Sequence, residues 1–250
     1  MNEKINYNFN GKIWNTTFGG DYCVLEIRDE INRQVSFSCV NISKGNILWE
    51  NLSPEKSWWL SLVGIFDEFL FIHKYSSSQK PEPEGLLVLA IESGENMMKL
   101  EGWIFFNYQE NILTIYQLQN NQPVYKRITL KKIVENNIDS LSNSDSHAVI
   151  HYPETSPYFP TIFKFLYRLL NIDAVKAVDY LEISNKIIIS YYIYKDKSFQ
   201  NYLLVTNRTR EILLNDLIAE TEGIGIDTFT VKSETLLYVK NQTQLVGYRL

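Results

Sequence analysis

A strand-turn-strand unit that recurs along this chain constrains its fold more than any other feature. The clearest copies are residues 35–49 and 86–98, and a more divergent copy spans residues 202–214. Each has an apolar, β-rich run, a short polar turn and a second apolar stretch. Gly45 and Gly94 occupy equivalent turn positions 49 residues apart, a spacing within the range of propeller blades. The repeat predicts an all-β architecture, and by itself it indicates no activity.

Hairpin patterns outside these copies extend the repeat over the whole chain. Each combines an apolar strand, a short polar turn and a second strand rich in β-branched and aromatic residues. The sequence therefore predicts a single β-propeller-like domain over 1–250, with about five four-stranded blades. The predicted blades span residues 11–52, 58–102, 103–152, 175–217 and 225–250. Because the last blade lacks one strand, we expect residues 5–9 to pair with it and close the ring.

One segment interrupts the period. Residues 156–172 place apolar side chains at helical rather than strand spacing, which predicts a short helical insertion. Lys164 and Arg168 lie four positions apart on the opposite face. A cationic face opposite an aromatic one would suit a membrane surface or a docking partner. The other interpretation, which we favour, is that the helix packs its apolar stripe on the flank of the propeller.

Charge and composition exclude several classes of protein. The net charge of −5 argues against a nucleic-acid partner, because phosphate recognition requires a clustered positive surface. The densest basic stretch, formed by Lys126, Arg127, Lys131 and Lys132, is typical of a solvated face. No segment has the roughly 18 uncharged apolar residues of a membrane span, and residues 1–14 show no secretory signal.

The two cysteines, Cys23 and Cys39, each lie in a strand-like apolar run. We expect buried free thiols there rather than a disulfide, and without a CxxC spacing they form no zinc site. Together with the missing signal, this predicts a cytoplasmic protein.

The turn segments also carry a family resemblance. Residues 85–98 and 41–52 resemble the repeat of quinoprotein-type (PQQ-type) propellers, in which a strand ends near an Asp, turns through a Gly and closes on a Trp. The Asp position here holds Asn41 or Ala90, and the closing Trp is present as Trp49. The chain, including residues 32–59, also resembles an uncharacterised bacterial family known as a domain of unknown function. These resemblances imply an architecture and no activity.

Departures from the quinoprotein pattern argue against a quinone cofactor. The resemblance would imply a larger ring and a disulfide between adjacent cysteines, whereas this chain has room for about five blades and its cysteines lie sixteen positions apart. The outer-membrane assembly scaffolds that share the repeat carry an export signal, which we do not find. We expect no cofactor.

Residues 145–154 contain Asp145, His147, His151 and Glu154, a set that suggests a metal site. The apolar residues 148–150 predict a strand, however, in which positions four apart lie about 13 Å from each other. That is too far for both to bind one ion, so we expect no metal centre.

Aromatic residues supply a binding hypothesis. Trp58 and Trp59 are adjacent, so in a strand they would point to opposite faces, and one could be exposed. Beside Tyr75 or Trp103, such a side chain would form a platform for a sugar, a peptide or a partner side chain. His73 follows an apolar strand and could line a pocket, although a histidine there is more often structural. The alternative is that these aromatic residues pack as core between blades.

An enzymatic alternative rests on Asp179 and Asp227, which lie near the starts of two predicted inner strands. Two carboxyl groups facing each other in a central funnel could act as the acid and base of a glycoside hydrolase, or both could be solvated strand-end acids. The chain has no nucleophile-elbow, phosphate-loop or dinucleotide-binding motif. The leading hypothesis is therefore a non-catalytic propeller-like protein that binds a partner protein or a small ligand.

Overall fold

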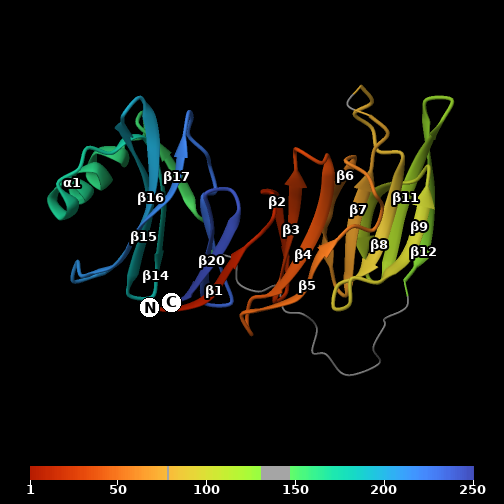
Figure 1. Cartoon of the computed structure of the whole chain (residues 1–250), viewed down its shortest axis with the longest axis horizontal. Coiled ribbons are helices and arrows are strands. Elements are labelled where there is room, and N and C mark those ends of the chain that lie inside the picture. The colour runs from red at the N-terminus through yellow and green to blue at the C-terminus, as the bar shows by residue number, and fades with distance from the viewer. Residues whose placement is uncertain (78, 131–146) are drawn as a thin grey trace. The chain divides into compact units, whose positions relative to one another are not determined.

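The computed structural model describes residues 1–77, 79–130 and 147–250 (Figure 1). Its described residues form an all-β protein with one helix and five antiparallel sheets, as expected from the repeat. The chain divides into two compact units: the first unit is Phe9–Ser144, and the second unit combines Met1–Asn8 with Asp145–Leu250. The basic residues Lys131 and Lys132 and the candidate metal ligand Asp145 lie outside the described residues.

The first unit contains three of the sheets, in chain order. One sheet comprises β2 (Lys12–Gly19), β3 (Tyr22–Asp29), β4 (Gln34–Asn41) and β5 (Asn46–Leu52). The next comprises β6 (Leu60–Phe66), β7 (Phe69–Lys74), β8 (Gly85–Ala90) and β9 (Asn96–Glu101). The third comprises β10 (Ile104–Gln109), β11 (Ile112–Gln119) and β12 (Gln122–Thr129). Within this unit, β2 contacts β6 and β8 contacts β10.

The middle sheet of the first unit is buried on both faces. Alternate residues of β7 serve two different cores: Leu70 and Ile72 pack toward the β2–β5 sheet, whereas Phe69 and Phe71 pack toward β10 and β11. Strand β8 divides its side chains in the same way. Because both faces are covered, these strands consist of continuous apolar residues rather than an alternating pattern.

The repeated turn has the same geometry in its two clearest copies. The amide of Gly45 donates to the carbonyl of Asn41 at 2.8 Å, and the amide of Gly94 donates to that of Ala90 at 2.8 Å. Both glycines have a left-handed backbone, with φ of 73° and 71°. The indole Nε1 of Trp49, which ends the first copy, donates to the carbonyl of Ile91 at 2.7 Å in the next sheet. The repeat therefore joins neighbouring sheets as well as shaping each one.

The second unit contains the other two sheets. One comprises β13 (Ile150–Pro153), β14 (Val175–Ile183), β15 (Lys186–Lys195), β16 (Ser198–Asn207) and β17 (Ile212–Thr221), in that order. The other has the order β1 (Asn2–Asn8), β20 (Gln244–Arg249), β19 (Thr235–Lys240) and β18 (Phe229–Lys232). Strand β1 pairs antiparallel with β20 from Asn2–Arg249 to Asn8–Gln244. The segment that we expected to complete the last sheet does so.

The insertion is a helix, as the apolar spacing predicted. Helix α1 (Phe159–Leu170) has Pro160 in its first turn and ends at Asn171, which has a left-handed φ of 55°. Its buried residues Phe159, Ile162 and Leu166 pack on one face of the five-stranded sheet (Figure 1). The apolar stripe of α1 is thus used in packing on the sheet, which was the favoured interpretation.

The opposite face of that sheet packs on the β1-β20-β19-β18 sheet. Neighbouring residues alternate between the two cores, as Ile188 and Ile189 on β15 show. Within the described residues, no helix has the length and apolar character that a membrane crossing requires.

Two boundaries differ from the predicted blades. Residues 150–152, expected at the end of the third blade, instead belong to β13 (Ile150–Pro153), which pairs with β14 in the fourth sheet. That sheet therefore has five strands, and the third sheet has three in the described part of the chain. The strand character of β13 was visible in the sequence, but its partner depends on a long-range register that no local pattern encodes.

The cysteines occupy adjacent strands as buried free thiols, as expected. Cys23 on β3 and Cys39 on β4 are both fully buried. Burial raises the pKa of the Cys39 thiol to about 12 and raises that of Cys23 further. Both are therefore protonated, unreactive core residues at neutral pH.

Candidate binding site

An open cavity of about 280 Å³ lies in the first unit and collects three of the aromatic residues that the sequence singled out. Trp58, Trp59 and Tyr75 all line it. The remaining lining residues come from β3, β6 and the connection between β7 and β8: Arg28, Leu60, Ser61, Ser77, Lys80 and Pro81. We call this cavity the aromatic pocket. Its volume lies near the lower end of the range for ligand pockets.

The two tryptophans precede β6 rather than lying within it. We expected a strand to send Trp58 and Trp59 to opposite faces, but the strand begins at Leu60 and both residues line the same pocket. The backbone amide of Tyr75 donates to the carbonyl of Trp59 at 2.8 Å, which fixes these two residues beside each other. Trp58 also packs against the core of the first unit, whereas Trp59 does not.

Arg28 is held in the pocket by two indole rings. Its guanidinium carbon lies 5.1 Å from the ring centroid of Trp14 and 5.0 Å from that of Trp58. Such cation–π contacts contribute about 0.5–2 kcal/mol each, more where the cation is desolvated. Trp14 remains 63% exposed, so it forms the outer side of this arrangement.

The buried carboxylate of Glu26 holds the guanidinium of Arg28 in place. Glu26 is fully buried, and its Oε1 accepts from Nε of Arg28 at 2.8 Å and lies 2.6 Å from Nη2. Its Oε2 accepts from the Ser61 hydroxyl at 3.2 Å and from the Leu62 amide at 3.0 Å. Nη2 of Arg28 also donates to the Leu60 carbonyl at 3.1 Å. The network satisfies the buried charge and joins β3 to β6.

This arrangement leaves specific groups for a ligand. In the described residues, Nη1 of Arg28 has no protein partner, so its two N–H groups can donate to an acceptor in the pocket. Burial and the charge of Glu26 raise the pKa of Tyr75, which keeps its hydroxyl protonated. The pocket therefore offers flat aromatic surfaces with hydrogen-bond donors beside them, a combination that suits a ligand with a planar or apolar face and an acceptor group.

His73 and Trp103, the other binding candidates, do not line the aromatic pocket. Nε2 of His73 accepts from the Phe105 amide at 3.1 Å, which connects β7 to β10. Trp103 packs against the core between the β6–β9 and β10–β12 sheets. The amine of Lys126 lies 5.6 Å from the ring centroid of Trp103. Both residues serve the contact between neighbouring sheets.

The buried position of His73 predicts a pH dependence of stability. Burial lowers its pKa from 6.5 to about 4 in the folded protein, so between these values the unfolded chain binds more protons. Lowering the pH from 7 to 4 should therefore remove up to roughly 3 kcal/mol of unfolding free energy through this residue. In urea unfolding, the unfolding free energy of His73→Gln should depend less steeply on pH than that of the wild type. The control His147→Gln, at an exposed position, should show the wild-type pH dependence. If the unfolding free energy of all three proteins changed equally with pH, His73 would not be the source of this pH dependence.

The acid/base alternative involves two residues in different surroundings. Asp179 is buried, and its Oδ2 accepts from the amide of Thr228 at 3.0 Å and from its hydroxyl at 2.8 Å. Its Oδ1 lies 2.7 Å from Nδ1 of His151, the residue opposite it on β13. Asp227 is exposed, with a left-handed φ of 53°. Both oxygens of Asp179 are thus engaged by protein groups.

Of the candidate metal ligands, His151 lies in a strand and His147 is exposed. No group of three or more His, Cys, Asp or Glu side chains suited to an ion occurs in residues 1–77, 79–130 and 147–250.

Sequence reasoning missed Glu26, Arg28 and Trp14. A signal for Glu26 was present, because a glutamate interrupts the otherwise apolar run at residues 23–27. A charge in such a strand is rarely buried without a partner, so it predicts an ion pair. Arg28, two residues later on the same face of β3, is that partner.

The fold and the pocket define a class: an all-β protein of antiparallel sheets with an open pocket lined by aromatic residues. A family model described as Domain of unknown function (DUF4905) matches residues 19–98, about a third of the chain, which include β3–β8 and both Trp58 and Trp59. The expected similarity to an uncharacterised family is therefore found over this part. No curated protein matches the chain.

A solved structure of a member of the DUF4221 family from Bacteroides vulgatus aligns with 97% of this chain and 94% of its own, at 11% identity and a TM-score of 0.23. At that score the alignment supports no argument about fold or function.

Proposed function

We propose that this chain is a non-catalytic, propeller-like binding protein, and that its aromatic pocket holds a partner side chain or a small ligand. The observation that carries the proposal is the convergence of Trp58, Trp59 and Tyr75 on one open cavity. Aromatic residues in a half-enclosed pocket are typical anchors of binding sites, since they offer a large contact area with little loss of conformational freedom.

The fixed arginine supports the same proposal. Trp14, Trp58 and Glu26 hold the guanidinium of Arg28 in one orientation, so a ligand does not have to order a flexible side chain when it binds. The two cysteines, buried and unlinked, agree with a reducing compartment, so the proposal includes a cytoplasmic location.

The carbohydrate-hydrolase alternative has less support. A general acid or base must be free to exchange a proton with the substrate. Asp179 instead uses both carboxylate oxygens to hold Thr228 and His151. We therefore favour binding over catalysis for this chain.

The test uses Trp59→Ala, since Trp59 lines the pocket without belonging to the core cluster that includes Trp58. We expect the variant to fold and to lose about tenfold or more of its affinity for whatever the pocket holds. All five tryptophans lie in the first unit, so ligand binding should also change the intrinsic fluorescence. The probes are a panel of monosaccharides and N-acetylated amino-acid amides, followed by co-purification with mass spectrometry.

Tyr194→Ala is the matched control, because it removes an aromatic side chain that is 60% exposed in the second unit. A ligand or partner that the wild type and Tyr194→Ala retain and Trp59→Ala loses would support the proposal. If the three proteins retain the same molecules, or retain none, the aromatic pocket is not a binding site.

A further inference from the structure

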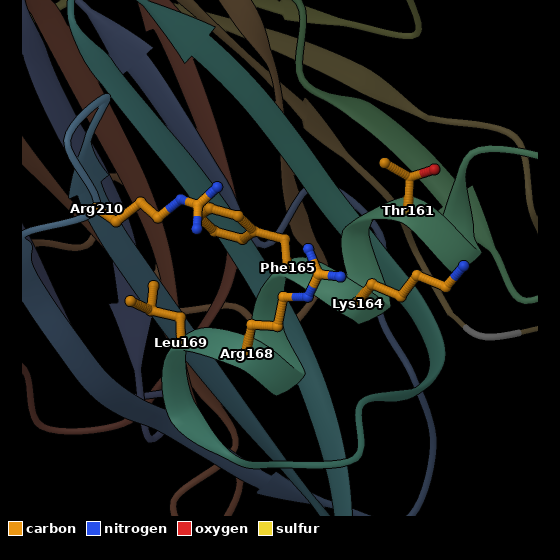
Figure 2. Close-up of a pocket in the computed structure, with 6 residues that line it drawn as sticks. All are labelled: Thr161, Lys164, Phe165, Arg168, Leu169 and Arg210. Carbon is orange, nitrogen blue, oxygen red and sulfur yellow. The ribbon is translucent and has the colours of Figure 1, made fainter.

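A second cavity, unrelated to the aromatic pocket, lies in the second unit between α1 and the turn that joins β16 to β17. It has a volume of about 290 Å³. Its lining residues are Thr161, Lys164, Phe165, Arg168, Leu169 and Arg210. Half of them are cations and none is acidic. In Figure 2 the side chain of Arg210 extends toward the ring of Phe165, Arg168 ends near the start of the Phe165 side chain in this view, and Lys164 extends away from Arg210.

The three cations of this pocket have no acidic partner. Ion pairs in the described residues engage many other basic side chains, including Arg208, which lies 3.8 Å from Glu182. No ion pair or side-chain hydrogen bond engages Lys164, Arg168 or Arg210 in that part of the chain. The attraction between Arg168 and the C-terminal end of α1 accounts for one of them only. In a protein with a net charge of −5, these three cations concentrate positive charge around one cavity.

The backbone at Arg210 shows how the pocket can be tested. The turn after β16 belongs to the third copy of the repeat, and Arg210 has a left-handed φ of 68° there. In the other two copies, glycine holds the left-handed turn position, as Gly45 and Gly94. A non-glycine residue is disfavoured in this conformation. Replacement of Arg210 by glycine therefore removes the cation without straining the backbone.

From these observations we infer that the pocket between α1 and the β16–β17 turn binds a phosphate monoester. The guanidinium groups of Arg168 and Arg210 present N–H donors suited to the oxygens of a phosphate, and the more flexible Lys164 adds a third positive charge. The hydroxyl of Thr161 is a further donor. Phe165 and Leu169 form an apolar wall that would contact the organic group of the ester.

The test is calorimetric titration of the whole chain with phenyl phosphate and with inorganic phosphate, at constant ionic strength in a chloride buffer. Phenyl phosphate should bind more tightly, because its ring contacts Phe165 and Leu169. Arg210→Gly should weaken the binding of both probes about tenfold, the usual effect of losing one charge-assisted contact. Its melting temperature should stay within about 2 °C of the wild-type value or exceed it, since glycine tolerates the left-handed backbone.

Lys197→Gly is a closely matched control. Lys197 is also an exposed cation with a left-handed φ, 71°, but it lies in the β15–β16 turn and does not line the pocket. This variant loses one charge and gains one glycine in the same way, so it should keep wild-type affinity for both probes. Equal weakening in Lys197→Gly and Arg210→Gly would overturn the inference, because binding would then follow net charge alone.

A second arm separates a soluble ester from a lipid headgroup with the same chemistry. Phosphatidylcholine vesicles containing phosphatidic acid display a phosphate monoester at their surface. Sedimentation with these vesicles that depends on Arg210, without binding of the soluble probes, would support the inference with a lipid as the source. If neither the soluble probes nor the vesicles bind in an Arg210-dependent manner, the inference is wrong. The aromatic pocket lies in the other unit, so neither result depends on its function.

Discussion

Removal of residues 1–8 is expected to destabilise the second unit by more than about 5 kcal/mol, comparable to the whole stability of a small domain. Strand β1 pairs along β20, and Ile5 is completely buried. Truncating one fully buried isoleucine costs about 2–5 kcal/mol, and the deletion also removes the strand pairing. It would further expose β20 as an unprotected edge, which favours aggregation.

Hydrogen exchange with peptide-level readout measures this effect in each unit separately. In the variant that lacks residues 1–8, peptides from β19 and β20 should lose protection against hydrogen exchange. Ile5→Ala should reproduce much of that loss. Lys4→Ala is the control, since Lys4 lies where the register of β1 shifts and has no cross-strand partner. Unchanged protection of β19 in the chain that begins at Phe9 would show that β1 is dispensable.

Replacement of Glu26 by glutamine should cost about 3–5 kcal/mol, the usual effect of removing one partner from a buried ion pair. The carboxylate of Glu26 is fully buried, and the Arg28 side chain is only 14% exposed. Glutamine would leave the guanidinium without a countercharge, and one amide cannot accept all the hydrogen bonds of the carboxylate. Urea unfolding followed by tryptophan fluorescence should show the loss directly.

Two variants make this test specific. Glu26→Leu combined with Arg28→Met should recover most of the stability, because an apolar pair often replaces a buried ion pair without loss. Glu30→Gln breaks the exposed pair with Lys12 and should cost less than about 1 kcal/mol. If Glu26→Gln lowers the unfolding free energy no more than Glu30→Gln does, the network of Glu26 and Arg28 does not hold β3 to β6.

Local patterns in the sequence predicted the elements whose form depends on nearby residues. Gly45 and Gly94 mark turns because the left-handed backbone there favours glycine, and that preference is local. The spacing of apolar residues in 156–172 identified α1 for the same reason. The continuous apolar residues of β7 and β8 reflect burial on two faces.

Features that depend on contacts between distant residues were not predictable in this way. Trp58 and Trp59 were recognised as a candidate site, yet their convergence depends on a strand that begins one residue later, at Leu60. The contact of Arg28 with Trp58 depends on the approach of β3 to the segment before β6. The pocket between α1 and the β16–β17 turn combines a helix with a turn about 40 residues further along the chain.

The pairing of β1 with β20 also has a consequence for folding during synthesis. Asn2 leaves the ribosome well before its partner Arg249, because nearly the whole described chain lies between them. The first unit can fold while β1 is still without its partner, since domains fold as units in the order in which they emerge. The nascent chain must therefore carry β1 as an unpaired strand until β20 has been translated, and during that interval β1 is open to a chaperone.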